Sequence, residues 1–98
     1  MYDRKDESVE LKVSVKTHPN KLGGAIAKYL KEVPMVYLTA MGDSCVNTAV
    51  KSIIVAQSFV AYEANALDIK IGFDTKFDEE LKKEITLIVF YLKLKKAE

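Results

Sequence analysis

The sequence of 98 residues contains one cysteine, one histidine and no tryptophan. The single cysteine, Cys45, cannot form an intramolecular disulfide, which excludes a disulfide-dependent secreted scaffold and favours the cytoplasm, or the nucleus in a eukaryote. The N-terminal residues are charged where a signal peptide is apolar, and no apolar run approaches the roughly 20 residues of a membrane span. We therefore expect a soluble intracellular protein without a membrane partner.

The sequence also lacks a strong excess of one charge, since its formal net charge is +1. A composition that by itself indicates a nucleic-acid-binding protein is much more basic. The charges are nevertheless unevenly distributed: residues 11–62 contain six lysines and two acids, whereas residues 63–84 contain seven acids and four lysines. The first half of the domain is thus basic, and the segment after it is acidic.

Length and composition predict one globular domain, because 49% of the residues are hydrophobic and 98 residues do not suffice for two independent cores. We expect this domain to span residues 9–94. Residues 1–8 and 95–98 are expected to be frayed, charged ends.

Hydrophobic periodicity predicts four strands and two helices. Strands are expected over residues 9–16, 35–41, 67–74 and 85–94, and the last of these is apolar on both faces, as in a central, covered strand. One helix is expected from Pro19 to Val33, with Thr17 or His18 as its cap. The other is expected to end near Tyr62, with Asp43 or Ser44 as its cap. Residues 75–83 read as a charged turn.

The order βαβαββ predicts a fold of the broad α/β class. Its arrangement should be an α+β two-layer sandwich. Right-handed crossovers should return each strand to a parallel neighbour and place both helices on one face of a mixed four-stranded sheet. The helix at 43–62 is apolar almost all round and needs cover on two sides. Gly23 and Gly24 lie inside the first helix, where glycine usually permits another backbone to approach closely.

Catalytic chemistry has little support in this sequence. His18 and Cys45 could form a thiolate pair, but a cysteine packed as a small apolar residue is the more common case. The acids near residue 80 are expected to be solvated rather than metal ligands. We expect no enzyme activity, catalytic residue, metal, cofactor or small-molecule substrate.

Polar side chains at the two helix starts are more informative. Free N–H groups at a helix N-terminus favour anions, and in a βαβα arrangement both helices start at the same end of the sheet. Capping would explain Thr17 and Ser44 equally well, and Asp43 opposes anion binding. The residues that could meet phosphates at this end are Lys16, His18, Asn20, Lys21, Asn47 and Lys51.

These same segments carry a family resemblance. The sequence resembles the stage V sporulation protein S (SpoVS) family, which is similar in turn to Alba, the archaeal chromatin protein. The resemblance covers roughly residues 9–92 and rests on Leu11–Lys16, Pro19–Asn20, Gly24–Ala25, Ala27, Gly42, Asn47, Ala49–Lys51 and Phe59–Ala61.

The resemblance implies an Alba-like fold, a dimer and nucleic-acid binding. It places Lys16, Asn20, Asn47 and Lys51 at the polar positions of the helix starts. The sequence departs from archaeal Alba where two lysines before the proline and an arginine before the glycine are replaced, and where a basic hairpin becomes acidic. The replacing residues are Thr17, His18, Met41 and residues 74–83.

The leading hypothesis is therefore a homodimer that binds DNA or RNA weakly to moderately, with low sequence specificity. The lysines would neutralise phosphates, the asparagines would donate hydrogen bonds, and His18 would add charge below neutral pH. The dimer is expected to use the helix at 43–62 and the last two strands, through Ile54, Phe59, Val89 and Tyr91. The alternatives are a protein-binding adaptor or regulator on the same fold and, less favoured, an enzyme.

Overall fold

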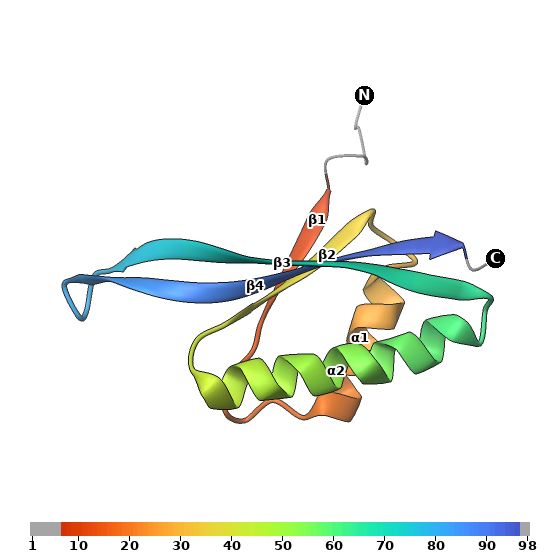
Figure 1. Ribbon diagram of the computed structural model, residues 1–98, viewed down its shortest axis with the longest axis horizontal. Helices are drawn as coiled ribbons and strands as arrows, with labels where there is room; N and C mark the ends of the chain where they lie inside the picture. The colour runs from red at the N-terminus through yellow and green to blue at the C-terminus, as the bar shows by residue number, and fades with distance from the viewer. Residues whose placement is uncertain (1–6, 97–98) are drawn as a thin grey trace.

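The computed structural model describes residues 7–96, in which two helices cover one face of a four-stranded sheet (Figure 1). The predicted order βαβαββ and the mixed α+β sheet are confirmed. The elements are β1 (Ser8–Lys12), α1 (Pro19–Tyr29), β2 (Met35–Ala40), α2 (Asp43–Ala61), β3 (Asn65–Asp78) and β4 (Lys83–Lys96).

The strands lie in the order β1-β2-β4-β3. Strand β1 is parallel to β2, and β4 is antiparallel to both β2 and β3. The predicted central position of the last strand is confirmed. The expectation that α2 returns the chain to a parallel neighbour is wrong, because the final hairpin places β4 between β2 and β3. Strand β3 consequently becomes an edge of the sheet.

Alternate residues of each strand face the helices or the opposite side, which we call the open sheet face. Val36, Leu38 and Leu92 face the helices and are fully buried there. On the open sheet face, β2 and β4 place Thr39 opposite Val89, and Tyr37 opposite Tyr91. The expected cover on both faces of β4 is thus only half correct, because among residues 7–96 no second layer of secondary structure lies over the open sheet face (Figure 1).

The two helices cross where Gly23 of α1 meets α2. A Cβ atom added at Gly23 would lie 2.8 Å from the backbone oxygen of Ser52 and 2.5 Å from Cγ1 of Val55. Even a methyl group therefore fits there only if Val55 or the α2 backbone shifts, which confirms the close backbone approach predicted at this glycine. Gly24 is not part of this contact, because its added Cβ would lie 3.9 Å from the ring of Phe59.

The hairpin of β3 and β4 is longer than predicted. Its ladder continues to the pair Asp78 and Lys83, so the turn comprises only residues 79–82 instead of 75–83. The carboxylate of Asp78 accepts hydrogen bonds from the backbone N–H groups of Glu80 at 2.8 Å and Leu81 at 3.0 Å. Because the hairpin extends past the helices (Figure 1), its charged residues stay solvated while the backbone pairs. The run of charged residues therefore did not predict where the turn begins and ends.

The first strand is shorter than predicted, because the chain turns after Lys12. The hydroxyl of Thr17 accepts a hydrogen bond from the Ser14 N–H at 2.9 Å, and the Thr17 N–H donates to the Ser14 carbonyl at 3.1 Å. Val15 consequently lies in an exposed loop. At the chain ends, residues 8, 95 and 96 pair in strands rather than fray, and residues 1–6 and 97–98 lie outside the described residues.

Helix α2 also meets the length and composition criteria of a membrane span, with a mean hydropathy of 1.2 over 18 residues. The sequence-based expectation that no segment meets these criteria is therefore wrong for α2. Core helices of globular domains share these criteria, and α2 packs here against α1, β2 and β3. This packing buries 33% of the 18-residue window, so the cover on two sides that the sequence predicts is incomplete and part of the apolar surface of α2 stays exposed.

The neighbouring glycines of α1 provide a matched test of the helix crossing. We expect Gly23→Ala to lower the free energy of unfolding by about 1–3 kcal/mol, because overpacking against the Ser52 backbone outweighs the gain in helix propensity. Gly24→Ala should instead raise it by up to about 1 kcal/mol, since only propensity changes. Urea denaturation followed by circular dichroism measures both, and equal effects of the two changes would contradict this account.

Candidate functional site

Both helices begin at the same end of the sheet. They follow the parallel strands β1 and β2, so their N-termini lie at the carboxyl ends of these strands (Figure 1). The helices cross where Gly23 of α1 meets Ser52 of α2. Asn20 lies one turn before Gly23, and Lys51 directly precedes Ser52. The crossing therefore places the first half of α1 against the middle of α2. We call the predicted polar residues of this region, Lys16, His18, Asn20, Lys21, Asn47 and Lys51, the helix-start edge.

The N-terminus of α1 has no side-chain cap. His18 is the N-cap residue but its imidazole makes no capping hydrogen bond, Pro19 occupies the first turn, and that turn contains no acid. The prediction of His18 as cap is therefore correct in position only, and Thr17 is engaged in the preceding turn. The backbone N–H groups of this turn remain available to an anion.

A shallow hollow of about 350 Å³ lies at this start of α1, lined by His18, Pro19, Asn20 and Lys21. His18, Asn20 and Lys21 are exposed, and Lys16 is exposed in the loop before them. The structure thus brings together three of the predicted contacts in one hollow. Neither Lys16 nor Lys21 has an ion-pair partner among residues 7–96.

The N-terminus of α2 is also uncapped by a side chain. Its N-cap is Gly42, with φ of 91°, so the predicted caps Asp43 and Ser44 are wrong. A glycine is required there because this φ is strained for other residues. Asn47 and Lys51 lie one turn apart on the exposed side of α2 and outside the hollow at α1. Asp43 in the first turn makes this start less favourable for anions than the start of α1.

The cysteine takes no part in this edge. Cys45 is buried in the hydrophobic core with Ala49 and Ala40. No contact joins it to the exposed His18 within the described part of the chain. The interpretation of Cys45 as a small apolar core residue is confirmed, and a thiolate pair with His18 has no structural basis.

Comparison with known proteins identifies the family. The model of the family "Stage V sporulation protein S (SpoVS)" matches residues 9–92, nearly the whole chain. The chain belongs to the SpoVS family. The same boundaries enclose both helix starts and all four strands apart from the ends of β1 and β4.

The fold of this SpoVS protein is also found in Alba from Thermoplasma volcanium. The two structures superpose with a TM-score of 0.53, over 92% of this chain and 100% of that one, at 11% sequence identity. At this identity the likeness concerns the fold alone. It confirms the Alba-like fold that the resemblance of the sequence implies.

The SpoVS protein exposes an apolar surface along α2 and β3. Ile54 and Val50 of α2 border a hollow of about 210 Å³, whose other side is formed by Ile69 and Ile71 of β3. Phe73 follows on the same side of β3 and is 79% exposed. We call Val50, Ile54, Ile71 and Phe73 the apolar strip. It adjoins the edge strand β3, whose outer backbone groups have no strand partner in the described sheet.

Only one of the four residues predicted for the dimer interface lies on the apolar strip. Ile54 belongs to it, whereas Tyr91 is on the open sheet face. Val89 is 2% exposed and cannot supply an interface, which corrects that prediction. The sequence missed Ile71 and Phe73 because their alternation with charged residues read as the buried side of an ordinary strand. In fact the hairpin of β3 and β4 extends beyond the part of the sheet that α2 covers (Figure 1).

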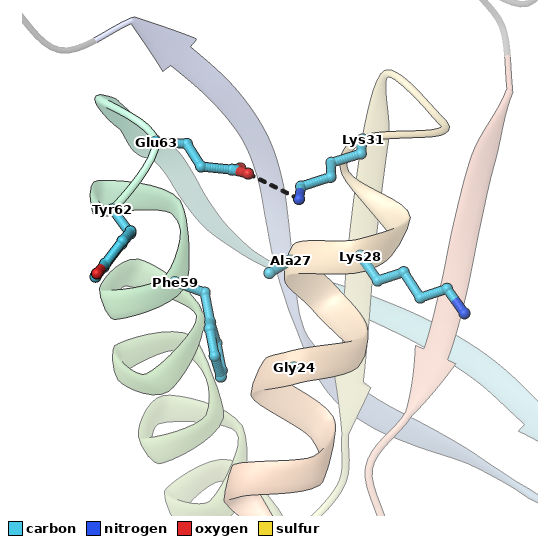
Figure 2. Close-up of a pocket in the computed structure, with 7 residues that line it drawn as sticks. All are labelled: Gly24, Ala27, Lys28, Lys31, Phe59, Tyr62 and Glu63. Carbon is cyan, nitrogen blue, oxygen red and sulfur yellow. Dashed lines mark hydrogen bonds and ion pairs between the residues drawn. The ribbon is translucent and has the colours of Figure 1, made fainter.

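Phe59 lies on a different side of α2, in a groove of about 340 Å³ between the C-terminal halves of the helices (Figure 2). Its ring points toward Gly24 of α1, and Tyr62 points away from the groove. Lys31 closes one end by an ion pair with Glu63 at 2.9 Å. Phe59 therefore does not join the apolar strip, and its predicted role in a dimer contact stays a prediction.

Proposed function

We propose that this SpoVS protein is a homodimer that binds nucleic acid with little sequence specificity through its helix-start edge. The observation that carries the proposal is the pair of helix N-termini without side-chain caps, accompanied by lysines that have no ion pair with any described residue. The Alba-like fold supports the same function. We place the protein in the cytoplasm, as an expectation from its single buried thiol.

Phosphate contacts would supply the affinity. Lys16, Lys21 and Lys51 would neutralise phosphates, and the amides of Asn20 and Asn47 would donate hydrogen bonds to phosphate oxygens. The free N–H groups at the start of α1 add further donors. Such contacts carry no base information, so little sequence preference follows. Binding through about three lysines per protomer should be weak or moderate, and its affinity should fall as the salt concentration rises. Neither a cofactor nor a catalytic step enters this function.

The three lysines of the helix-start edge provide the direct test. Lys16→Ala, Lys21→Ala or Lys51→Ala should each lower affinity at low salt and flatten the slope of log K against log salt by about one unit per protomer. Sequence preference should not change. Fluorescence anisotropy titrations at several salt concentrations measure this. Lys95→Ala, a lysine in β4 outside the edge, is the matched control. If all four variants bind like the parent protein, the edge is misassigned.

The acidic hairpin turn should oppose this binding by repulsion. Glu79→Lys combined with Glu80→Lys is expected to strengthen binding and to steepen its salt dependence. Asp78 must be kept, because its carboxylate holds the turn. The double change to glutamine should give a smaller gain in the same titration. Unchanged affinity in the lysine variant would place the hairpin away from the nucleic acid.

The apolar strip is the surface we propose for dimerisation. Exposed Ile54 and Ile71 adjoin an unpaired strand edge, and large apolar surfaces of this kind are usually covered in solution. A symmetric contact between two copies of the strip would bury both features. It would leave Lys16, His18, Asn20 and Lys21 at the start of α1 accessible, whereas Asn47 and Lys51 lie beside Val50 and Ile54 on α2 and would border the contact.

Charge introduced into the apolar strip should separate the protomers. Ile54→Asp is expected to shift the protein from dimer to monomer at tens of micromolar, because an unpaired carboxylate would be buried in the contact. Phe59→Asp is the matched control on the other side of the same helix. Sedimentation velocity distinguishes the states, and circular dichroism verifies the fold. A monomeric parent protein would contradict the proposal.

A second candidate function is a protein-binding adaptor. The groove between the helices favours it, because it presents the half-exposed ring of Phe59 beside the small residues Gly24 and Ala27 (Figure 2). An adaptor would bind through this groove and would be insensitive to the helix-start lysines. The lysine titrations above therefore separate the two functions.

A further inference from the structure

Two tyrosines form a pair on the open sheet face. Tyr37 of β2 and Tyr91 of β4 are direct cross-strand partners. Their ring centroids are 6.0 Å apart, and the rings are tilted by 32°. Tyr91 is 36% exposed, and the two helices lie on the far side of the sheet (Figure 1). The pair thus presents an aromatic surface on a face that neither the helix-start edge nor the apolar strip uses.

Gly72 of β3 leaves space beside this aromatic surface. It lies on the open sheet face as the register partner of Val89, two residues before Tyr91. A Cβ added at Gly72 would be in ordinary van der Waals contact with the Tyr91 ring, at 3.8 Å from Cε2. The backbone of Gly72 does not have a positive φ, so the position would accept other residues. The missing side chain therefore keeps one side of the Tyr91 ring accessible.

Two lysines flank the same ring. A hollow of about 230 Å³ is lined by Met35, Asp68, Lys70, Tyr91 and Lys93. Lys70 is the cross-strand partner of Tyr91, and Lys93 follows it by two residues on β4. Within residues 7–96 neither lysine forms an ion pair. The carboxylate of Asp68 also faces this hollow, where it repels a phosphate but can accept a hydrogen bond from a base amino group.

We propose that this hollow, the tyrosine platform, binds single-stranded nucleic acid by stacking a base on Tyr91. Lys70 and Lys93 contact the flanking phosphates, which accounts for cations on both sides of an accessible ring. A duplex cannot use the platform, since its bases already stack on one another. The inference rests on the proposed nucleic-acid function and specifies a single-stranded ligand on a second surface. It needs no catalytic step.

Removal of the ring tests the platform. Tyr91→Ala should weaken binding of fluorescein-labelled oligothymidylate about tenfold, the effect typical of one base stacked on an aromatic side chain. Binding of a duplex of the same length should not change. Tyr91→Phe keeps the stacking surface and should bind like the parent protein. Tyr62→Ala removes a tyrosine on the helix side of the molecule that is more exposed than Tyr91, and it is the control.

Filling the space beside the ring tests the platform without removing a contact residue. Gly72→Leu should weaken oligothymidylate binding as strongly as Tyr91→Ala, because the new side chain covers the ring. Leucine is compatible with the extended backbone here, and circular dichroism verifies the fold of both variants. An abasic oligonucleotide of the same length should bind the parent protein as weakly as oligothymidylate binds Tyr91→Ala.

The outcomes separate the platform from the helix-start edge. If Tyr91→Ala and Gly72→Leu bind oligothymidylate like the parent, or weaken duplex binding equally, the platform is wrong. If the helix-start lysines still matter in that case, the proposed function stands without it. If single-strand binding depends on Tyr91 but not on those lysines, the platform stands and the edge is wrong. Absence of all nucleic-acid binding, or binding of an acidic peptide alone, overturns both.

Discussion

The close crossing of α1 and α2 at Gly23 is the contact on which the arrangement of the molecule depends. Only a residue without a side chain lets the α1 backbone approach Ser52 and Val55 of α2. The crossing packs the two helices together on one face of the sheet and brings the first half of α1 against the middle of α2. Both helix starts lie at the carboxyl ends of the parallel strands β1 and β2, and among residues 7–96 no further helix or strand covers the opposite face of the sheet.

Packing on one face divides the surface into regions with different chemistry. The helix-start edge offers lysines and free backbone N–H groups, which suit phosphates. The apolar strip offers Ile54, Ile71 and Phe73 beside an unpaired strand edge, which suits a second copy. The open sheet face offers a tyrosine pair with lysines beside it. The start of α1 and the open sheet face lie apart from the apolar strip, so the proposed dimer would leave them accessible to the proposed nucleic acid, while Asn47 and Lys51 would lie at its border.

A shared fold does not imply a shared surface. The SpoVS protein and Alba from Thermoplasma volcanium share their fold at 11% identity. In this chain the hairpin turn carries Glu79 and Glu80, and its carboxylate at Asp78 serves to hold the turn. Acidic residues there would repel a polyanion from the hairpin turn. The helix-start edge and the tyrosine platform are then the surfaces on which the proposed binding depends.

The sequence by itself determined the element order, the central place of β4 and the close approach at Gly23, because periodicity and glycine position are local signals. It also identified His18, Asn20 and Lys21, which the structure gathers in one hollow. Only the tertiary structure decided that Val89 is buried, that Phe59 and Ile54 lie on different sides of α2, and that Ile71 and Phe73 are exposed. Alternation along a strand reveals which residues share a face. It cannot reveal how far a helix extends over that face, because this depends on the length of the helix and on the angle at which it packs against the strands.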